Sequence, residues 1–263
     1  MSMYSYFSKQ AKKESMKMNF ALFFLLMITS CFSPKVYSSD APMHLDSFVS
    51  VNINATHTGR SLCIVPSCPD EIVNAIYMGS GVSVAKKSSK DTSLILTAGH
   101  VCENYFTVPE ELRKRSLYVS SVRSISVTDY SGHEHSAAIL VIDSVNDMCL
   151  LEVEGEIRPA RIGSRPKTGD EVFNESAPLD ISYPNAVPIL GGFYCGSAEV
   201  YKDLNMSLYS VPGAPGSSGS PIFDSDGELI GILTKVVSTF DNISLGPNYD
   251  SMKEFIKAGK KSL

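Results

Sequence analysis

The strongest constraint on the fold is a succession of short apolar stretches, broken by turn residues, that fills the chain from residue 45 onward. Several stretches alternate between apolar and polar residues, which is the pattern of a strand with one buried face. The predicted strands are Ile76–Val84, Thr92–Thr97, Leu117–Val122, Ser124–Thr128, Ala137–Ile142 and Met148–Val153. Many short strands separated by turns favour a β-barrel or a β-sandwich, so the sequence predicts an all-β fold.

Helical periodicity is clear only at the C-terminal end of the chain. Tyr249, Met252, Phe255 and Ile256 are spaced like one face of a helix, and lysines occupy the other positions. Glycine, proline and charged residues cluster at 154–167, where we expect the boundary between two halves of the fold.

The composition excludes several classes of protein. Hydrophobic residues make up 43% and charged residues 19% of the 263 residues, which is too apolar for a disordered chain. The formal net charge of −5 argues against nucleic-acid binding, which usually needs a basic face. His133 and His135 flank Glu134, but they follow the turn residues Ser131 and Gly132, so we interpret them as part of an exposed hairpin and expect no metal site.

The N-terminal residues are those of an export signal. Phe20–Ile28 is an apolar run far shorter than the ~20 residues that a membrane-spanning helix needs, and four lysines precede it. Two ends of this signal are compatible with the sequence: simple cleavage near Ser38 or Ser39, or a bacterial lipobox that ends in a lipidated Cys31. We therefore expect residues 1–40 to be a leader, and the protein to be periplasmic or secreted, with membrane contact only through a lipid on Cys31.

The cysteines beyond Cys31 are five, so at least one is free or paired outside the chain. Cys149 lies in an apolar run, and we interpret it as a small buried hydrophobic residue. Cys63 and Cys68 are close enough in the sequence to close a small loop.

Two motifs contain residue types that act in catalysis. Leu96–Cys102 is a strand end with small residues and His100, and Gly213–Pro221 is a glycine-rich turn around Ser218. Asp147 opens an apolar strand between them. Histidine, aspartate and serine in this order are the residue types of nucleophilic catalysis in chymotrypsin-like peptidases.

Each residue type has a chemical reason to be there. A serine hydroxyl needs a base to take its proton as it attacks a carbonyl, and histidine can take that proton and return it to the leaving amine. An aspartate holds the imidazole in one tautomer. Glycine before the serine lets the chain turn so that the N–H groups of Gly216 and Ser218 can point at the developing oxyanion.

Further motifs occur in register with these. They are Gly79-Ser-Gly81, Leu96–Val101, Ala137–Val153, Ile162–Asp170, Gly216–Pro221 and Asp226–Ile232. Together they resemble the trypsin-like serine peptidases over residues 74 to 256, and in particular the bacterial branch of HtrA-type and glutamyl (V8-like) endopeptidases. The resemblance implies two six-stranded antiparallel β-barrels, at 41–158 and 159–245, and a C-terminal helix at 246–263. It also implies a protein or peptide substrate and no cofactor.

Two departures from the family pattern affect activation and specificity. Trypsin has an aspartate before the nucleophile that pairs with a newly freed N-terminus, whereas this chain has Ser217, so we expect activity without such processing. The specificity pocket would be formed by Pro212, Gly213, Thr234 and Val236. It has no carboxylate for lysine or arginine, and Leu233 replaces the histidine of glutamyl endopeptidases. We therefore expect a preference for small or apolar side chains.

Two alternatives belong to other classes of protein. The chain could be a peptidase-like binding protein without activity, although an intact triad argues against it. It could be a quality-control protease of the HtrA type, but only about 20 residues follow the last predicted barrel strand, too few for the PDZ domain of that branch. The oligomeric state is not encoded in any motif.

Overall fold

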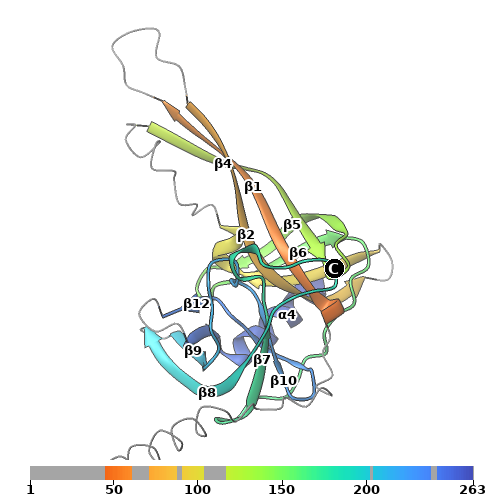
Figure 1. Cartoon of the computed structure of the whole chain (residues 1–263), viewed down its shortest axis with the longest axis vertical. Helices are drawn as coiled ribbons and strands as arrows, with labels where there is room; N and C mark the ends of the chain where they lie inside the picture. Colours follow the sequence, from red (N-terminus) through yellow and green to blue (C-terminus); the bar gives the residue numbers. More distant parts are fainter. Residues whose placement is uncertain are drawn as a thin grey trace, which may run out of the picture. The chain divides into compact units, whose positions relative to one another are not determined.

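Six strands close an antiparallel barrel in the computed structural model, which describes residues 45–60, 71–87, 91–103, 117–201, 204–237 and 242–262. The strand order around the barrel is β1-β2-β3-β6-β5-β4. The strands are β1 (Phe48–Arg60), β2 (Glu71–Lys87), β3 (Thr92–Ala98), β4 (Leu117–Asp129), β5 (Glu134–Asp143) and β6 (Met148–Glu154), after a 3-10 turn η1 (Leu45–Ser47). In Figure 1, β1, β2 and β4 continue past the barrel as a three-stranded extension.

The second half is a seven-stranded sheet in the order β11-β10-β7-β8-β9-β13-β12. Its strands are β7 (Glu171–Glu175), β8 (Ile189–Tyr201), β9 (Leu204–Tyr209), β10 (Pro221–Asp224), β11 (Leu229–Ile232), β12 (Lys235–Val236) and β13 (Ser244–Pro247). A 3-10 turn η2 (Pro178–Asp180) follows β7, and helix α4 (Tyr249–Ser262) ends the described chain.

The predicted all-β class with two barrel-like halves and a C-terminal helix is confirmed. The second half has seven strands where six were expected, because the two-residue β12 adds to the end of the sheet. The stretch expected as two strands around residue 123 is one strand, β4. A register shift opposite Asn54 and Ala55 takes up the break in alternation, so β4 pairs with β1 on both sides of it.

The sequence of strand β3 is apolar on both faces because both faces are buried. Ile95 points into the barrel, among a cluster that includes Val49, Val51 and Leu151. Leu94 and Leu96 point the other way, into a cluster of side chains from β6, β10, β11 and α4. The second cluster joins the barrel to the second half, and burial on both sides makes β3 the centre of the molecule.

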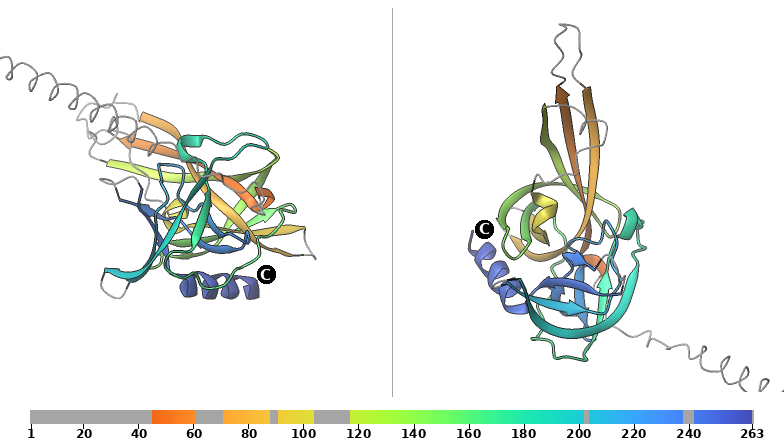
Figure 2. Two further views of the ribbon diagram at one scale, coloured as in Figure 1. Left: turned by 60° about the horizontal axis from the view of Figure 1, so that its bottom comes forward. Right: turned by 90° about the vertical axis from the view of Figure 1, so that its left-hand side faces the viewer.

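Helix α4 closes the larger cluster with the face that its periodicity predicts. Met252 and Ile256 are fully buried there, Tyr249 is 5% exposed, and Phe255 packs at the edge. Figure 2 shows α4 lying along one side of the molecule.

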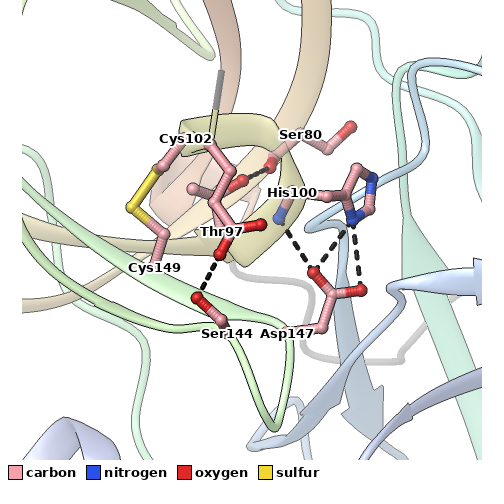
Figure 3. Close-up of a disulfide and its surroundings, with 8 residues drawn as sticks. Ser80, Thr97, His100, Cys102, Ser144, Asp147 and Cys149 are labelled. Atoms are coloured by element: carbon pink, nitrogen blue, oxygen red, sulfur yellow. Dashed lines mark hydrogen bonds and ion pairs between the residues drawn. A yellow bond between two sulfur atoms is a disulfide. The ribbon is translucent and has the colours of Figure 1, made fainter. Parts of the chain in front are cut away.

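A disulfide corrects the interpretation of one cysteine. Cys149 is fully buried as expected, but it is bonded to Cys102 across 47 residues of sequence (Figure 3). A loop of this length predicts a stabilisation of about 4 kcal/mol by the chain-entropy estimate. Cys195 is a free and exposed thiol.

The remaining N-terminal predictions fall outside the described residues. They concern the export signal with its cleavage site, the lipobox Cys31, and the small loop between Cys63 and Cys68. Within the described part of the chain, no helix is both long and apolar enough to span a membrane.

Candidate active site

His100, Asp147 and Ser218 meet at one point, although they are far apart in the sequence. His100 lies in the short helix α2 (Gly99–Cys102), directly after β3. Its Nε2 atom is 2.8 Å from Ser218 Oγ, and its Nδ1 atom is 3.0 and 3.1 Å from the two carboxylate oxygens of Asp147. Figure 3 shows the Asp147 carboxylate facing the His100 ring. This continuous series allows a proton to pass between the serine hydroxyl and the imidazole.

The turn before β6 fixes the position of Asp147. The Asp143 carboxylate accepts the backbone N–H of Asn146 at 3.0 Å and its side-chain amide at 2.7 Å. Asp147 itself has a φ of +58°, in the left-handed region that aspartate adopts more readily than most side chains. One of its carboxylate oxygens also accepts the backbone N–H of His100 at 2.8 Å. Asp147 therefore holds both the backbone and the ring of His100.

Asp147 keeps its negative charge in this environment. Burial raises its pKa, but the hydrogen bonds and electrostatic attraction of His100, with a smaller contribution from the positive charge of Lys235, outweigh that effect, so the pKa lies below its usual range. The Lys235 ammonium is 3.6 Å from the carboxylate and 40% exposed, so its contribution is modest. An ionised carboxylate at neutral pH can stabilise an imidazolium ion beside it.

Two glycines shape the turn that carries Ser218. Gly216 and Gly219 have φ values of +95° and +87°. A Cβ atom would lie 2.4 Å from the Ala177 carbonyl oxygen at the first position and 2.2 Å from the Ser80 carbonyl oxygen at the second, so only glycine fits. The N–H groups of Gly216 and Ser218 donate no hydrogen bond within the described part of the chain. Two backbone donors next to Ser218 Oγ are therefore available for a ligand.

Ser80 joins this turn to the first barrel. Its N–H donates to the Ser218 carbonyl at 2.8 Å, and its hydroxyl donates to the Gly216 carbonyl at 2.8 Å. The same hydroxyl accepts the Ala177 N–H at 3.1 Å, and the Ser80 carbonyl accepts the Thr97 hydroxyl at 2.7 Å. Ser80 is fully buried, and each of its polar atoms is satisfied. The backbone on both sides of Ser218 is thus positioned from β2.

Comparison with known proteins identifies the family. The family model of the trypsin-like peptidase domain matches residues 79–232, a span that holds His100, Asp147 and Ser218. This chain belongs to the trypsin-like peptidase family.

Similar proteins in this family include the serine proteases Do-like HtrB and HtrA of Bacillus subtilis (strain 168). They are 27% identical over 177 residues and 25% identical over 178 residues, which is 64% of this chain in each case. The matches cover 34% and 36% of those proteins, so the chain spans about a third of their length. The putative protease Do-like 14 of Arabidopsis thaliana is 23% identical over 270 residues, covering 92% of this chain and 59% of that protein.

A solved structure has the same fold. The crystal structure of the serine endoprotease from Yersinia pestis matches with a TM-score of 0.53 at 20% identity, over 78% of this chain and 62% of that one.

In this trypsin-like peptidase, the four residues predicted to form the specificity pocket differ in their surroundings. A Cβ atom at Gly213 would lie 2.5 Å from Val236 Cγ1 and 3.2 Å from Leu233 Cδ1, so Val236 covers Gly213 directly. Val236 is 41% exposed, and Pro212 is partly exposed. Thr234 is 4% exposed, and its hydroxyl has no hydrogen-bond partner within the described part of the chain. The structure thus brings Gly213 and Val236 together and buries Thr234 beside them.

Sequence reasoning missed two residues of this site. Ser80 belongs to the motif Gly79-Ser-Gly81, which resembles the family pattern but does not indicate that Ser80 binds the backbone around Ser218. Lys235 has no sequence signal, because its contact with Asp147 depends on how β12 lies against the turn before β6. The interpretation of His133 and His135 as hairpin residues agrees with their positions, since both contact Asp129, at 3.5 and 3.1 Å. No group of potential metal ligands gathers within the described ranges.

The end of β7 carries an unusual buried acid. Glu175 is 1% exposed, and its Oε2 atom has no hydrogen-bond partner among the residues that the structure describes. Burial, with a smaller contribution from the negative charge of Asp46, raises the pKa of Glu175 to about 8. Glu175 lies two residues before Ala177, whose N–H donates to the Ser80 hydroxyl. This acid is therefore close in the sequence to the hydrogen bonds that position the turn around Ser218.

Ser80→Ala removes the hydroxyl and leaves the Gly216 carbonyl and the Ala177 N–H without partners in a buried place. We expect a loss of about 1–3 kcal/mol in the free energy of unfolding, measured by urea denaturation. Ser136→Ala, at an exposed serine on β5, is the control and should change stability by less than about 0.5 kcal/mol. Equal effects of the two substitutions would contradict the role of Ser80.

Glu175→Gln tests the buried acid through pH. The folded-state pKa of about 8 lies above the ordinary value of 4.5, so the stability that protonated Glu175 contributes is present below pH 4.5 and lost as pH rises to 8. Glutamine does not ionise. The variant should therefore be more stable than the parent by roughly 2–4 kcal/mol at pH 8 and no more stable at pH 4. Glu171→Gln, at the exposed start of β7, should show no such pH dependence; a parallel shift in both variants would refute the interpretation.

Proposed function

We propose that this protein is an exported serine endopeptidase that cuts peptide bonds through an acyl-enzyme, with Ser218 as nucleophile, His100 as general base and Asp147 as the residue that orients His100. The observation that carries the proposal is the 2.8 Å separation of His100 Nε2 and Ser218 Oγ, with Asp147 bonded to the other ring nitrogen, in a chain of this family. The substrate is a protein or peptide. No step requires a metal ion or a cofactor.

The reaction follows from these positions. His100 Nε2 takes the Ser218 hydroxyl proton while Oγ bonds to the carbonyl carbon of the scissile peptide, whose oxygen becomes negatively charged. The imidazolium then gives the proton to the leaving amine as the C–N bond breaks, leaving an ester on Ser218. Water, activated by the same histidine, hydrolyses this ester and restores the hydroxyl.

The free N–H groups of Gly216 and Ser218 are the proposed oxyanion donors. Each binds the carbonyl oxygen most strongly when it carries charge, so they favour the tetrahedral state over the bound substrate. Losing one such donor typically costs about 3 kcal/mol of transition-state stabilisation.

Activity in this proposal does not depend on cutting an internal peptide bond to free an N-terminus. Ser217 replaces the aspartate that such activation uses in trypsin. Its hydroxyl accepts the Ala214 N–H at 3.2 Å, and its side chain is fully buried. The turn is thus closed by local hydrogen bonds and presents no carboxylate for a new amino group.

Export is supported by the leader-like residues 1–40 and by the disulfide between Cys102 and Cys149, since disulfides persist in oxidising compartments. We propose that residues 41–158 and 159–245 form the two peptidase halves, followed by the helix at 246–263. Two ends of the leader are proposed: simple cleavage near Ser38 or Ser39, which leaves no membrane attachment, or lipidation of Cys31, which attaches the protein through that lipid.

The specificity proposal is a pocket for small or apolar side chains on the residue before the scissile bond. Val236 covers Gly213, and the proposed pocket residues carry no charge that would bind lysine, arginine or glutamate. A narrow apolar pocket discriminates by size more than by charge.

Ser218→Ala removes the nucleophile without changing the turn that holds it. We expect loss of casein cleavage and of labelling by a fluorophosphonate probe, because both need Oγ. Ser217→Ala, at the neighbouring serine, is the control and should still be labelled. Undiminished labelling of the Ser218 variant would exclude Ser218 as the nucleophile, and no labelling of the folded parent protein would favour a peptidase-like binding protein.

Val236→Gly should open the space over Gly213. Profiling cleavage of a peptide library should show the ratio of kcat/KM for phenylalanine over alanine before the scissile bond rise by about tenfold or more. Val200→Gly, at an exposed valine on β8, controls for loss of an exposed side chain. A strong preference for arginine, lysine or glutamate in the parent would refute the pocket.

A further inference from the structure

Lys235 is the second charged side chain beside the Asp147 carboxylate. Its Nζ atom is 3.6 Å from Asp147 Oδ2, and His100 Nδ1 is 3.1 Å from the same oxygen. The ammonium and the ring nitrogen are therefore at most about 7 Å apart, and they share one carboxylate. Within the described part of the chain, Lys235 forms no other ion pair.

The fold fixes the point from which the Lys235 side chain starts. Its strand, β12, pairs with β13 through Lys235 and Leu245, and the N–H of the preceding Thr234 donates to the Leu245 carbonyl at 2.9 Å. The Asp147 side chain is 12% exposed, whereas the Lys235 side chain is 40% exposed. Solvent therefore screens the pair in part, and at this distance the ammonium acts as a nearby charge more than as a hydrogen-bond donor.

The acidic side chains next to Asp147 in the chain fold are bound to its own turn. The Asp143 carboxylate accepts the N–H and the side-chain amide of Asn146, at 3.0 and 2.7 Å, and the Glu103 carboxylate accepts the Ser144 hydroxyl. Among the described residues, Lys235 is the only lysine or arginine that contacts Asp147. It is therefore the one permanent positive charge that acts on the carboxylate from within this part of the chain.

A positive charge in this place has two opposite effects on the proposed catalysis. His100 must be neutral before it takes the Ser218 proton, and it carries a positive charge once it has taken it. Repulsion from Lys235 disfavours that charge, so neutral His100 persists to lower pH and activity there is higher. The same repulsion offsets part of the stabilisation that Asp147 gives the imidazolium, so activity at neutral pH is lower.

We propose that Lys235 is a positioning residue whose charge beside Asp147 extends the activity of the peptidase to lower pH. The inference rests on the proposed function, in which His100 is the general base. In a partly solvated site, one charge at about 7 Å moves the midpoint of the acid limb of kcat/KM by about half a pH unit. At neutral pH the same charge lowers kcat/KM by less than about twofold.

Lys235→Gln tests this role, because it removes the charge and keeps most of the length of the side chain. Measured with a fluorogenic peptide and the full chain, the acid midpoint of kcat/KM should rise by about half a pH unit. One pH unit below the parent's midpoint, cleavage should be about twofold slower than in the parent. Above pH 8 it should be faster, by less than about twofold, so the two pH profiles cross. Loss of a merely structural contact would lower the profile at every pH.

Two further variants and a salt series control the test. Lys235→Arg keeps the positive charge and should keep the parent's midpoint. Lys86→Gln removes a lysine that is 39% exposed, close to the 40% of Lys235, and that pairs with Glu156 at 2.6 Å; it should not move the midpoint. In 1 M NaCl the difference between the parent and Lys235→Gln should shrink, because salt screens partly exposed charges. Melting temperatures check that each variant is folded.

The outcomes separate this inference from the proposed function. Equal midpoints in the parent and Lys235→Gln overturn the inference and leave the peptidase function standing. A uniform fall of kcat/KM at every pH, or an equal shift in Lys86→Gln, does the same. No cleavage of the peptide and no fluorophosphonate labelling of the folded parent overturn the peptidase function, and the inference with it.

Discussion

The hydrogen bonds of Ser80 are the constraint on which the site depends. One small residue in β2 binds the carbonyls on both sides of the nucleophile turn, the backbone after β7, and the hydroxyl of Thr97 in β3. Ser80, Thr97 and Ala177 are buried, so an error in the position of any one leaves a buried polar group without a partner. The first barrel thereby determines where the second half places Ser218, while β3 and the Asp147 carboxylate position His100.

A second constraint is electrostatic. The pKa of Asp147 is lowered because His100 donates hydrogen bonds to its carboxylate and the Lys235 ammonium lies 3.6 Å away. Glu175 is more deeply buried, its Oε2 atom has no hydrogen-bond partner among the described residues, and its pKa is raised to about 8. The two acids have opposite pKa shifts for one reason: burial favours the neutral form unless a donor or cation compensates for it. The contrast explains why Asp147 carries a charge at neutral pH and Glu175 does not.

Much of this site could be predicted from the sequence. His100, Asp147 and Ser218 stand in motifs whose order and strand context limit the chemistry, and the structure brings them within hydrogen-bond distance. Periodicity also identified the buried face of α4, because a helix repeats its contacts locally. What the sequence could not provide depends on contacts between distant segments. Cys149 looks like any small apolar residue until Cys102 lies beside it, and the break in alternation at residue 123 looks like a strand end until β1 continues past it.

The disulfide makes the rigidity of the site depend on whether the chain has been oxidised. Cys102 lies two residues after His100, and Cys149 lies two residues after Asp147, so the bond cross-links the two segments that carry His100 and Asp147. Before oxidation, these segments are held together by strand pairing, packing and the hydrogen bonds between His100 and Asp147, with no covalent bond. In a reducing compartment the chain therefore lacks the covalent bond between the segments of His100 and Asp147. In an exported protein, this disulfide forms only after the chain has reached an oxidising compartment outside the cytoplasm.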